Sequence, residues 1–104
     1  MDWTAAAEDL YNAVRGFNPW PCCFCEAPRG AGRWLKVLRS RVEEPVASAG
    51  RQAGEVLDVA GEGPLVLTGD GVLRLTEVQP EGRKAMSGGA YLSGHALKRG
   101  DVLG

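Results

Sequence analysis

The chain has 104 residues and a net charge near −1, from 12 basic and 13 acidic side chains. This length fits a single domain with one modest core, and no apolar run is long enough to span a bilayer, so no membrane role is expected. Because the charges balance, nucleic-acid binding would need a local basic patch, and without a signal peptide at the N-terminus the expected compartment is the cytoplasm.

A helix followed by a rigid connector is predicted at the N-terminus. Apolar residues recur there at the spacing of one helical face, at Ala7, Leu10, Tyr11 and Val14. We expect the helix to cover residues 4–16, with Thr4 as its N-cap and Gly16 at its end. Two prolines then forbid helix continuation, so residues 18–21, Asn-Pro-Trp-Pro, predict a stiff extended connector.

The remainder, residues 22–104, has the pattern of an all-β barrel or sandwich, with short valine- and leucine-rich runs separated by glycine. The predicted strands are Cys22–Glu26, Arg33–Val42, Gly54–Val59, Leu65–Thr68 and Val72–Val78. The last two are joined by Gly69-Asp70-Gly71, which favours a tight antiparallel hairpin. In that hairpin Leu73 and Leu75 should face the core, and Arg74 and Thr76 should face away.

Less regular segments complete the domain. Residues 43–53 lack periodicity and predict a surface loop, and residues 79–84 predict a turn. Ser87 is expected to cap a short helix that runs to about Gly94, and Asp101–Leu103 is expected to be a last extended piece that closes the domain.

Several segments share the pattern of one known protein domain. Near the N-terminus these are Asp2-Trp3-Thr4 and Val14-Arg15-Gly16-Phe17-Asn18-Pro19-Trp20-Pro21. Further on they are the segment from Leu75 to Met86, Tyr91-Leu92-Ser93-Gly94, and Gly100-Asp101-Val102-Leu103-Gly104. In order and spacing, along nearly the whole chain, they resemble the C-terminal domain of the methionyl-tRNA formyltransferase family.

The resemblance implies a single domain over residues 1–104, a mainly β fold built as an open Greek-key barrel of the oligonucleotide-binding type. It implies five or six strands, an N-terminal helix and a short C-terminal helix. In the family this domain helps to hold initiator tRNA, while a separate N-terminal catalytic domain formylates the attached methionine from formyl-tetrahydrofolate. The chain itself would then hold no cofactor. The alternative is a structural module that braces a formyltransferase or hydrolase for a small-molecule acceptor.

Basic residues could supply the RNA contacts. The candidates are Arg33, Lys36, Arg39 and Arg41 in or beside one predicted strand, and Arg83 and Lys84 in a turn. Such a set could follow a phosphate backbone, or it could form an ordinary solvated strand face. Strict alternation places Arg33, Arg39 and Arg41 on the same face as Leu35 and Val37, so that face enters the core unless a bulge re-aims it.

Aromatic residues that stack on bases would strengthen an RNA-binding hypothesis. Trp34, in the basic strand, is the candidate, although tryptophan is largely buried often enough that core packing is the favoured interpretation. Trp3 and Trp20 flank the predicted helix and are expected to pack it against the barrel.

No catalytic or metal site is predicted. Cys22, Cys23 and Cys25 with His95 lack the spacing of a zinc site, in which two residues usually separate paired cysteines. Adjacent Cys22 and Cys23 would also point to opposite faces of a strand. The favoured interpretation of the cysteines is therefore that they are small buried side chains. His95 has no recognisable nucleophile partner. The glycines at 61–63 and 69–71 are interpreted as turns, and the adjacent Glu43 and Glu44 as soluble loop residues.

Overall fold

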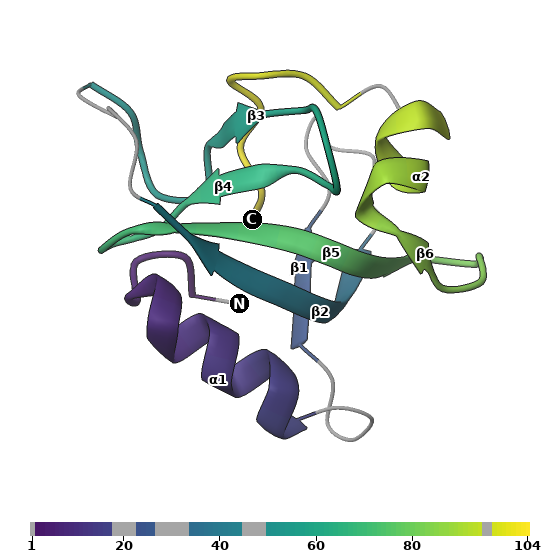
Figure 1. The fold of residues 1–104 in the computed structure, drawn as a ribbon, viewed down its shortest axis with the longest axis horizontal. Helices are drawn as coiled ribbons and strands as arrows, with labels where there is room; N and C mark the ends of the chain where they lie inside the picture. The colour runs from purple at the N-terminus through teal and green to yellow at the C-terminus, as the bar shows by residue number, and fades with distance from the viewer. Residues whose placement is uncertain (1, 18–22, 27–33, 45–49, 95–96) are drawn as a thin grey trace.

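A computed structural model describes residues 2–17, 23–26, 34–44, 50–94 and 97–104 (Figure 1). Within these residues the chain forms two helices and one antiparallel sheet of six strands. The helices are α1 (Ala7–Phe17) and α2 (Gly88–Gly94). The strands are β1 (Cys23–Glu26), β2 (Trp34–Glu43), β3 (Val56–Asp58), β4 (Leu65–Leu67), β5 (Val72–Pro80) and β6 (Met86–Ser87). The predicted mainly β fold with two helices is therefore confirmed.

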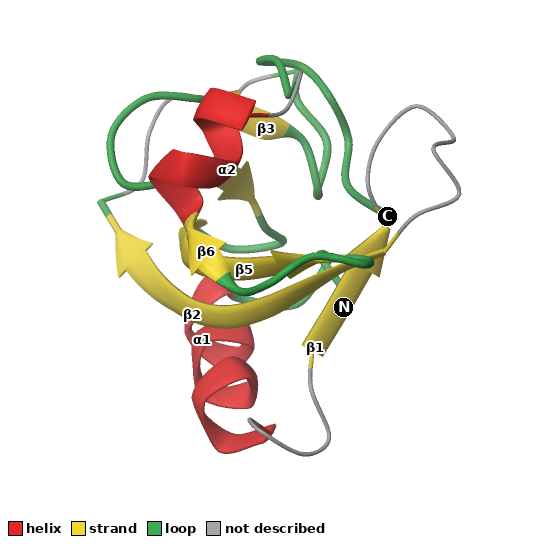
Figure 2. Cartoon of the chain, turned by 90° about the vertical axis from the view of Figure 1, so that its right-hand side faces the viewer, coloured by secondary structure: helices red, strands yellow, loops and turns green. Residues whose placement is uncertain are grey.

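The sheet is open, with the strand order β1-β2-β5-β4-β3 and with β6 paired to β5. The helix α1 lies below β2 and β5 in the view of Figure 1, and α2, β3 and β4 lie above them. The rotated view of Figure 2 shows the same arrangement for α1, α2 and β3. Among the described residues no helix is both long and apolar enough to cross a membrane.

The helix α1 is amphipathic as predicted, but it begins and ends later than residues 4–16. Ala7, Leu10 and Val14 are buried against the sheet, in agreement with the helical spacing. Thr4 is not the N-cap, because its amide and hydroxyl both donate to the carboxylate of Asp2. Gly16 does not end the helix either, since α1 continues through Phe17. The predicted connector at residues 18–21 lies outside the described residues.

Two contacts with the β4–β5 turn explain the late start of α1. The amide of Gly69 donates to the carbonyls of Trp3 and Ala5, at 2.9 and 3.0 Å, and the amide of Ala7 donates to the carbonyl of Asp70 at 2.8 Å. The hairpin thus binds the backbone of the segment that precedes α1. The carbonyls of Trp3 and Ala5 and the amide of Ala7 are therefore not free to form an earlier helical turn.

The predicted β4–β5 hairpin is confirmed, with Leu67 opposite Val72. Gly71 adopts a φ of 89°, which glycine reaches without steric cost. Leu73 and Leu75 are fully buried as expected. The turn predicted at residues 79–84 is partly wrong, because Gln79 and Pro80 still belong to β5.

The bulge considered for the basic strand is present in β2. The pairing with β5 shifts between Val37 and Arg39, and again between Arg39 and Ser40. Leu35 and Val37 therefore remain in the core, while Arg39 points to solvent. Strict alternation fails here because the extra residue re-aims the strand.

The remaining strand boundaries differ by one or two residues from the prediction. The strand β3 is shorter than Gly54–Val59, and β2 extends into the predicted loop 43–53 as far as Glu43. The two-residue strand β6 was not predicted. Ser87 caps α2 as expected, its hydroxyl accepting a hydrogen bond from the amide of Ala90 at 3.1 Å.

The C-terminal segment contacts both edges of the sheet, as expected for a closing piece. At the β3 edge, Leu103 donates its amide to the carbonyl of Gly54 at 2.8 Å, and Val102 forms an isolated bridge with Glu55. At the β1 edge, the backbones of Gly104 and Glu26 exchange two hydrogen bonds of 3.1 and 3.2 Å. The segment links the two edge strands without forming a strand of its own.

Candidate nucleic-acid interface

An exposed aromatic surface lies on the outer face of β1 and β2, and it consists of Phe24, Trp34 and Lys36. In β1 the buried Cys23 and Cys25 alternate with outward residues, so Phe24 points to solvent. Phe24 lies opposite Lys36 in the strand pairing, and Trp34 is two residues from Lys36 on the same face. The pleat of two paired strands therefore gathers all three side chains.

The two rings of the aromatic surface are in contact but remain accessible. Their centroids are 5.3 Å apart and their planes meet at 88°, an edge-to-face arrangement. Phe24 is 43% exposed and Trp34 is 38% exposed. The Nζ of Lys36 lies 5.7 Å from each ring centroid, within the range of a cation–π interaction. The surface thus combines apolar stacking area with a positive charge.

The turn between β5 and β6 lies directly beside the aromatic surface. The backbones of Glu81 and Trp34 are joined by a hydrogen bond of 3.2 Å, and the Glu81 carboxylate accepts from the Trp34 amide at 3.3 Å. Gln79 lies opposite Lys36 and donates from its side chain to the carbonyl of Arg83 at 2.9 Å. Gln79 therefore places the backbone of Arg83 near Lys36, and the exposed Lys84 follows Arg83 in the same turn.

The other predicted cations of β2 are engaged elsewhere. Arg39 is highly exposed and forms an ion pair of 3.1 Å with Glu77. Arg41 donates to the carboxylates of Glu43 and Glu62, and these bonds raise its pKa. Arg33 lies outside the described residues. Only part of the predicted basic set is thus gathered at one place.

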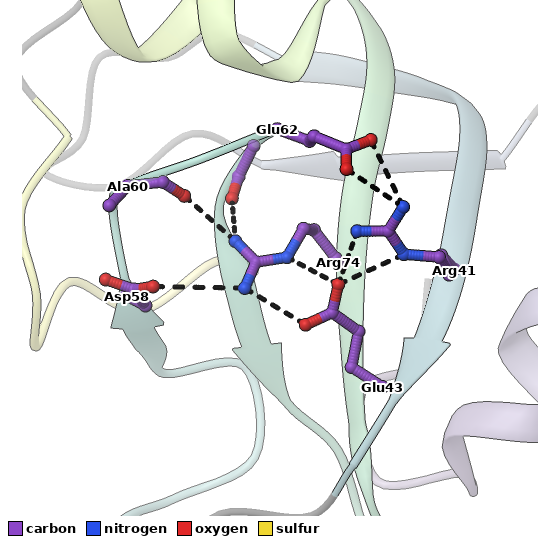
Figure 3. A network of polar contacts seen from close by, with 7 residues as sticks. Arg41, Glu43, Asp58, Ala60, Glu62 and Arg74 are labelled. Carbon is purple, nitrogen blue, oxygen red and sulfur yellow. Dashed lines mark hydrogen bonds and ion pairs between the residues drawn. The ribbon is translucent and has the colours of Figure 1, made fainter.

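Arg41 belongs to an ionic network at the far end of β2, shown in Figure 3. Its centre is the pair of Glu43 and Arg74, joined by two hydrogen bonds of 2.8 and 3.0 Å. The Arg74 side chain is 11% exposed, and its remaining donors reach the carbonyls of Ala60 and Gly63 at 2.9 and 2.7 Å. Hydrogen bonds, first from Arg74 and then from Arg41, lower the pKa of Glu43 to about 2.

This network has a structural role. Arg74 satisfies its donors within the protein and ties β5 to the end of β2 and to the turn before β4, because a largely buried cation needs such partners. The network lines an open groove of about 1020 Å³, in which Arg41 and Arg74 already have carboxylate partners. The interpretation of Glu43 as a soluble loop residue is wrong, since it ends β2 and holds two arginines.

The cysteines behave as small core residues where they are described. Cys23 and Cys25 are buried on the inner face of β1, and desolvation raises the pKa of Cys25 to about 12. The thiol therefore stays protonated at neutral pH. Among the described residues no group of three or more histidines, cysteines, aspartates or glutamates could hold a metal ion. Cys22 and His95 lie outside the described part.

The sequence interpretation was wrong on one aromatic residue and missed another. Trp34 does not pack into the core, because it lies on the outward face of β2. Phe24 was not considered, although its position between two small residues in a short strand was a signal for an outward ring. Trp3 is buried as expected, and Trp20 lies outside the described residues.

These features define a class of small antiparallel β domains that present aromatic rings and cations on an exposed sheet face. The family model described as the C-terminal domain of formyl transferases matches residues 1–96, and the chain belongs to this family. Methionyl-tRNA formyltransferases are among its curated relatives. This chain is 41% identical to the methionyl-tRNA formyltransferase of Heliobacterium modesticaldum, 42% identical to the one of Bacillus pumilus and 39% identical to the one of Bacillus subtilis.

These alignments cover 100% of this chain but only 34%, 32% and 32% of the three relatives. The chain thus spans about a third of the length of the curated relatives it matches.

Proposed function

We propose that this domain helps to bind and position initiator tRNA for a methionyl-tRNA formyltransferase. Its partner would be an N-terminal catalytic domain, which transfers the formyl group from formyl-tetrahydrofolate, in the cytoplasm. The identity of about 40% along the whole chain to proteins of that name supports this proposal. The domain contributes binding and orientation, which lower the entropic cost of presenting the aminoacyl end.

The observation that carries the proposal is the group of cations around the aromatic surface. Within the described part of the chain, Lys36, Arg83 and Lys84 form no ion pair with a carboxylate. Phosphate oxygens can therefore bind them without breaking an existing salt bridge, and each contact releases counterions from the RNA. The net charge of the chain does not favour RNA binding, but this local arrangement of cations supports the proposal.

The two further candidates in β2 should contribute less. Arg39 shares its charge with Glu77, and Arg41 is held by two carboxylates. A phosphate would have to compete with these partners for the same donors. We therefore rank Lys36, Arg83 and Lys84 above Arg39 and Arg41 as phosphate ligands.

The test is a titration of the purified chain with initiator tRNA at several salt concentrations. We expect saturable binding that weakens as salt rises. Replacing Lys36, Arg83 and Lys84 together by glutamine should lower the slope of log K against log salt by about one for each lost contact. The Arg41→Gln variant should change this slope little.

Lys98→Gln is the matched control. Lys98 is an exposed lysine in the turn that bonds to β3, at the other edge of the sheet, so Lys98→Gln removes the same single charge as the variant Lys36→Gln, with which it is compared, but at a distant place. An equal loss of affinity in Lys98→Gln would mean that net charge alone governs binding, and it would contradict the proposed surface.

The alternative is a bracing module for a formyltransferase or hydrolase with a small-molecule acceptor, and the net charge of −1 favours it. A folded chain that binds no tRNA even at low salt would support this alternative and reject the tRNA-positioning role.

A further inference from the structure

We propose that the aromatic surface formed by Phe24, Trp34 and Lys36 binds an unpaired base, so that the domain recognises single-stranded RNA next to a phosphate contact. This inference rests on the proposed RNA-binding function and specifies which part of an RNA the surface takes.

The first argument is the cost of leaving these rings in water. Phe24 and Trp34 contact each other edge to face, and yet the two residues remain 43% and 38% exposed. Large aromatic rings gathered on one exposed face are typical of binding surfaces. A flat ring face is complementary to the flat face of a nucleobase.

The second argument is the preorganisation of Trp34. Its backbone amide and carbonyl are both bonded to Glu81, and its strand is paired on one side with β1 and on the other with β5. The ring is therefore presented on a rigid element, and little backbone entropy is lost on binding. An exposed ring on a mobile loop would lack this advantage.

The third argument concerns the kind of nucleic acid. Bases inside a duplex are stacked on one another and hidden from side chains, whereas unpaired bases can be splayed out onto aromatic rings. The deep, narrow major groove of an RNA duplex does not admit such rings. The surface therefore fits an unpaired nucleotide and not a helical stem.

The fourth argument is the arrangement of charge. Lys36 lies over both rings, and its flexible ammonium can move to a phosphate while a base takes its place. Beyond Lys36 lie Gln79 and the backbone of Arg83, whereas Glu26 is opposite Trp34 and Glu81 is bonded to it. The phosphate should therefore lie towards Lys36 and Arg83, away from the two carboxylates.

The experiment compares a blunt RNA hairpin, closed by a compact loop whose bases stack on one another, with the same hairpin carrying a short single-stranded tail, both titrated against the 104-residue chain. We expect the tail to tighten binding at least about fivefold, the lower limit for stacking one base. Trp34→Leu and Phe24→Leu should each reduce this ratio towards one and leave the affinity for the blunt hairpin nearly unchanged. Part of this ratio should persist at high salt, because stacking, unlike the phosphate contact, does not depend on counterion release.

The matched control is Tyr11→Leu. Tyr11 is a half-buried residue of α1, and the Cζ of Arg15 lies 5.3 Å from the centroid of its ring. The substitution therefore removes a similar pair of aromatic ring and cation elsewhere on the molecule. It should leave the ratio intact. Thermal melts followed by circular dichroism check that each variant folds, and Phe24→Leu serves as an independent variant if Trp34→Leu does not.

The failures of the two proposals differ. Binding of both hairpins by the wild-type chain with equal affinity, weakening as salt rises, would overturn the unpaired-base inference and leave the RNA-binding function standing. Absence of binding to either hairpin at low salt would overturn both. Loss of the ratio in Tyr11→Leu as well would also overturn the assignment to this surface.

Discussion

At the scale of single residues, Glu43 is the carboxylate partner of two arginines. Its carboxylate accepts hydrogen bonds from Arg74 and Arg41, and these partners hold its pKa at about 2 instead of the ordinary 4.5. The side chain of Arg74 is mostly covered by protein, so the loss of this acceptor would leave a cation poorly compensated. The pair thus links the end of β2 to β5.

Replacement of Glu43 by glutamine should lower the free energy of unfolding at neutral pH by roughly 2 kcal/mol, because a neutral amide compensates neither guanidinium. Since the pKa of Glu43 is lower in the folded protein, its ionised form stabilises the fold above pH 4.5, and this contribution is lost as the pH falls from about 4.5 to about 2. Urea unfolding at a series of pH values should show the difference between wild type and Glu43→Gln shrinking over that interval.

Glu44 provides the matched control for this prediction. It is the next residue, is exposed and follows the end of β2. Glu44→Gln should change the free energy of unfolding by no more than about 0.5 kcal/mol. A Glu43→Gln variant as stable as wild type at neutral pH would show that the network contributes nothing to folding.

Residue environments in the candidate site were predictable only where local pattern decides them. The amphipathic face of α1 and the buried Leu73 and Leu75 follow from spacing alone. The exposure of Trp34 did not, because alternation defines two faces of a strand without saying which one the core covers. The engagement of Arg41 depends on Glu62, which is distant in sequence.

At the scale of elements, α1 and the β4–β5 turn that contacts the segment before it each contain a glycine, and the two glycines have opposite expectations. Gly16 lies within the helix, and a Cβ there would meet nothing within 4 Å. Gly69 lies in the β4–β5 turn, where a Cβ would overlap the carbonyl of Thr4. Gly16 thus lowers the helix propensity of α1 without allowing any close contact, whereas Gly69 allows a close approach of two backbones.

Gly16→Ala should therefore raise the free energy of unfolding by roughly 0.5–1 kcal/mol, since alanine restricts the unfolded chain and favours the helix. Gly69→Ala should lower it by more than about 1 kcal/mol, because the segment before α1 must move away from the hairpin. Chemical denaturation of the two variants measures both. A stabilising effect at Gly69 would contradict the close contact with Thr4.

The same elements explain which boundaries the sequence could predict. The β4–β5 hairpin was predicted because its turn chemistry is local, with glycines on either side of Asp70. The start of α1 was not, because the amide of Gly69 already bonds Trp3 and Ala5. The strand β6 exists only through its pairing with β5, so two residues of sequence carried no signal for it.

At the scale of the whole molecule, the C-terminal segment joins the two edges of an open sheet. Leu103 is 2% exposed and lies between the bonds to Gly54 and the paired backbone of Glu26 and Gly104. Since β1 carries Phe24, the anchoring of this edge strand also supports the aromatic surface. The sequence predicted that Asp101–Leu103 closes the domain, but only the structure reveals that the C-terminal segment reaches both edges of the sheet.

Leu103→Ala should lower the free energy of unfolding by roughly 2–5 kcal/mol, the usual cost of a cavity left by a buried leucine. Val102→Ala is the control, because Val102 is 37% exposed and its truncation should cost far less.

Leu103→Ala should also weaken the protein unevenly, with β1 affected most, because the Glu26–Gly104 hydrogen bonds depend on the position of the neighbouring Leu103. Hydrogen exchange should therefore accelerate more at the amides of β1 than in the β4–β5 hairpin, and the preference for a tailed hairpin should fall with it. Uniform acceleration across the sheet would instead mean that the segment stabilises the domain as a whole and does not specifically hold β1 in place.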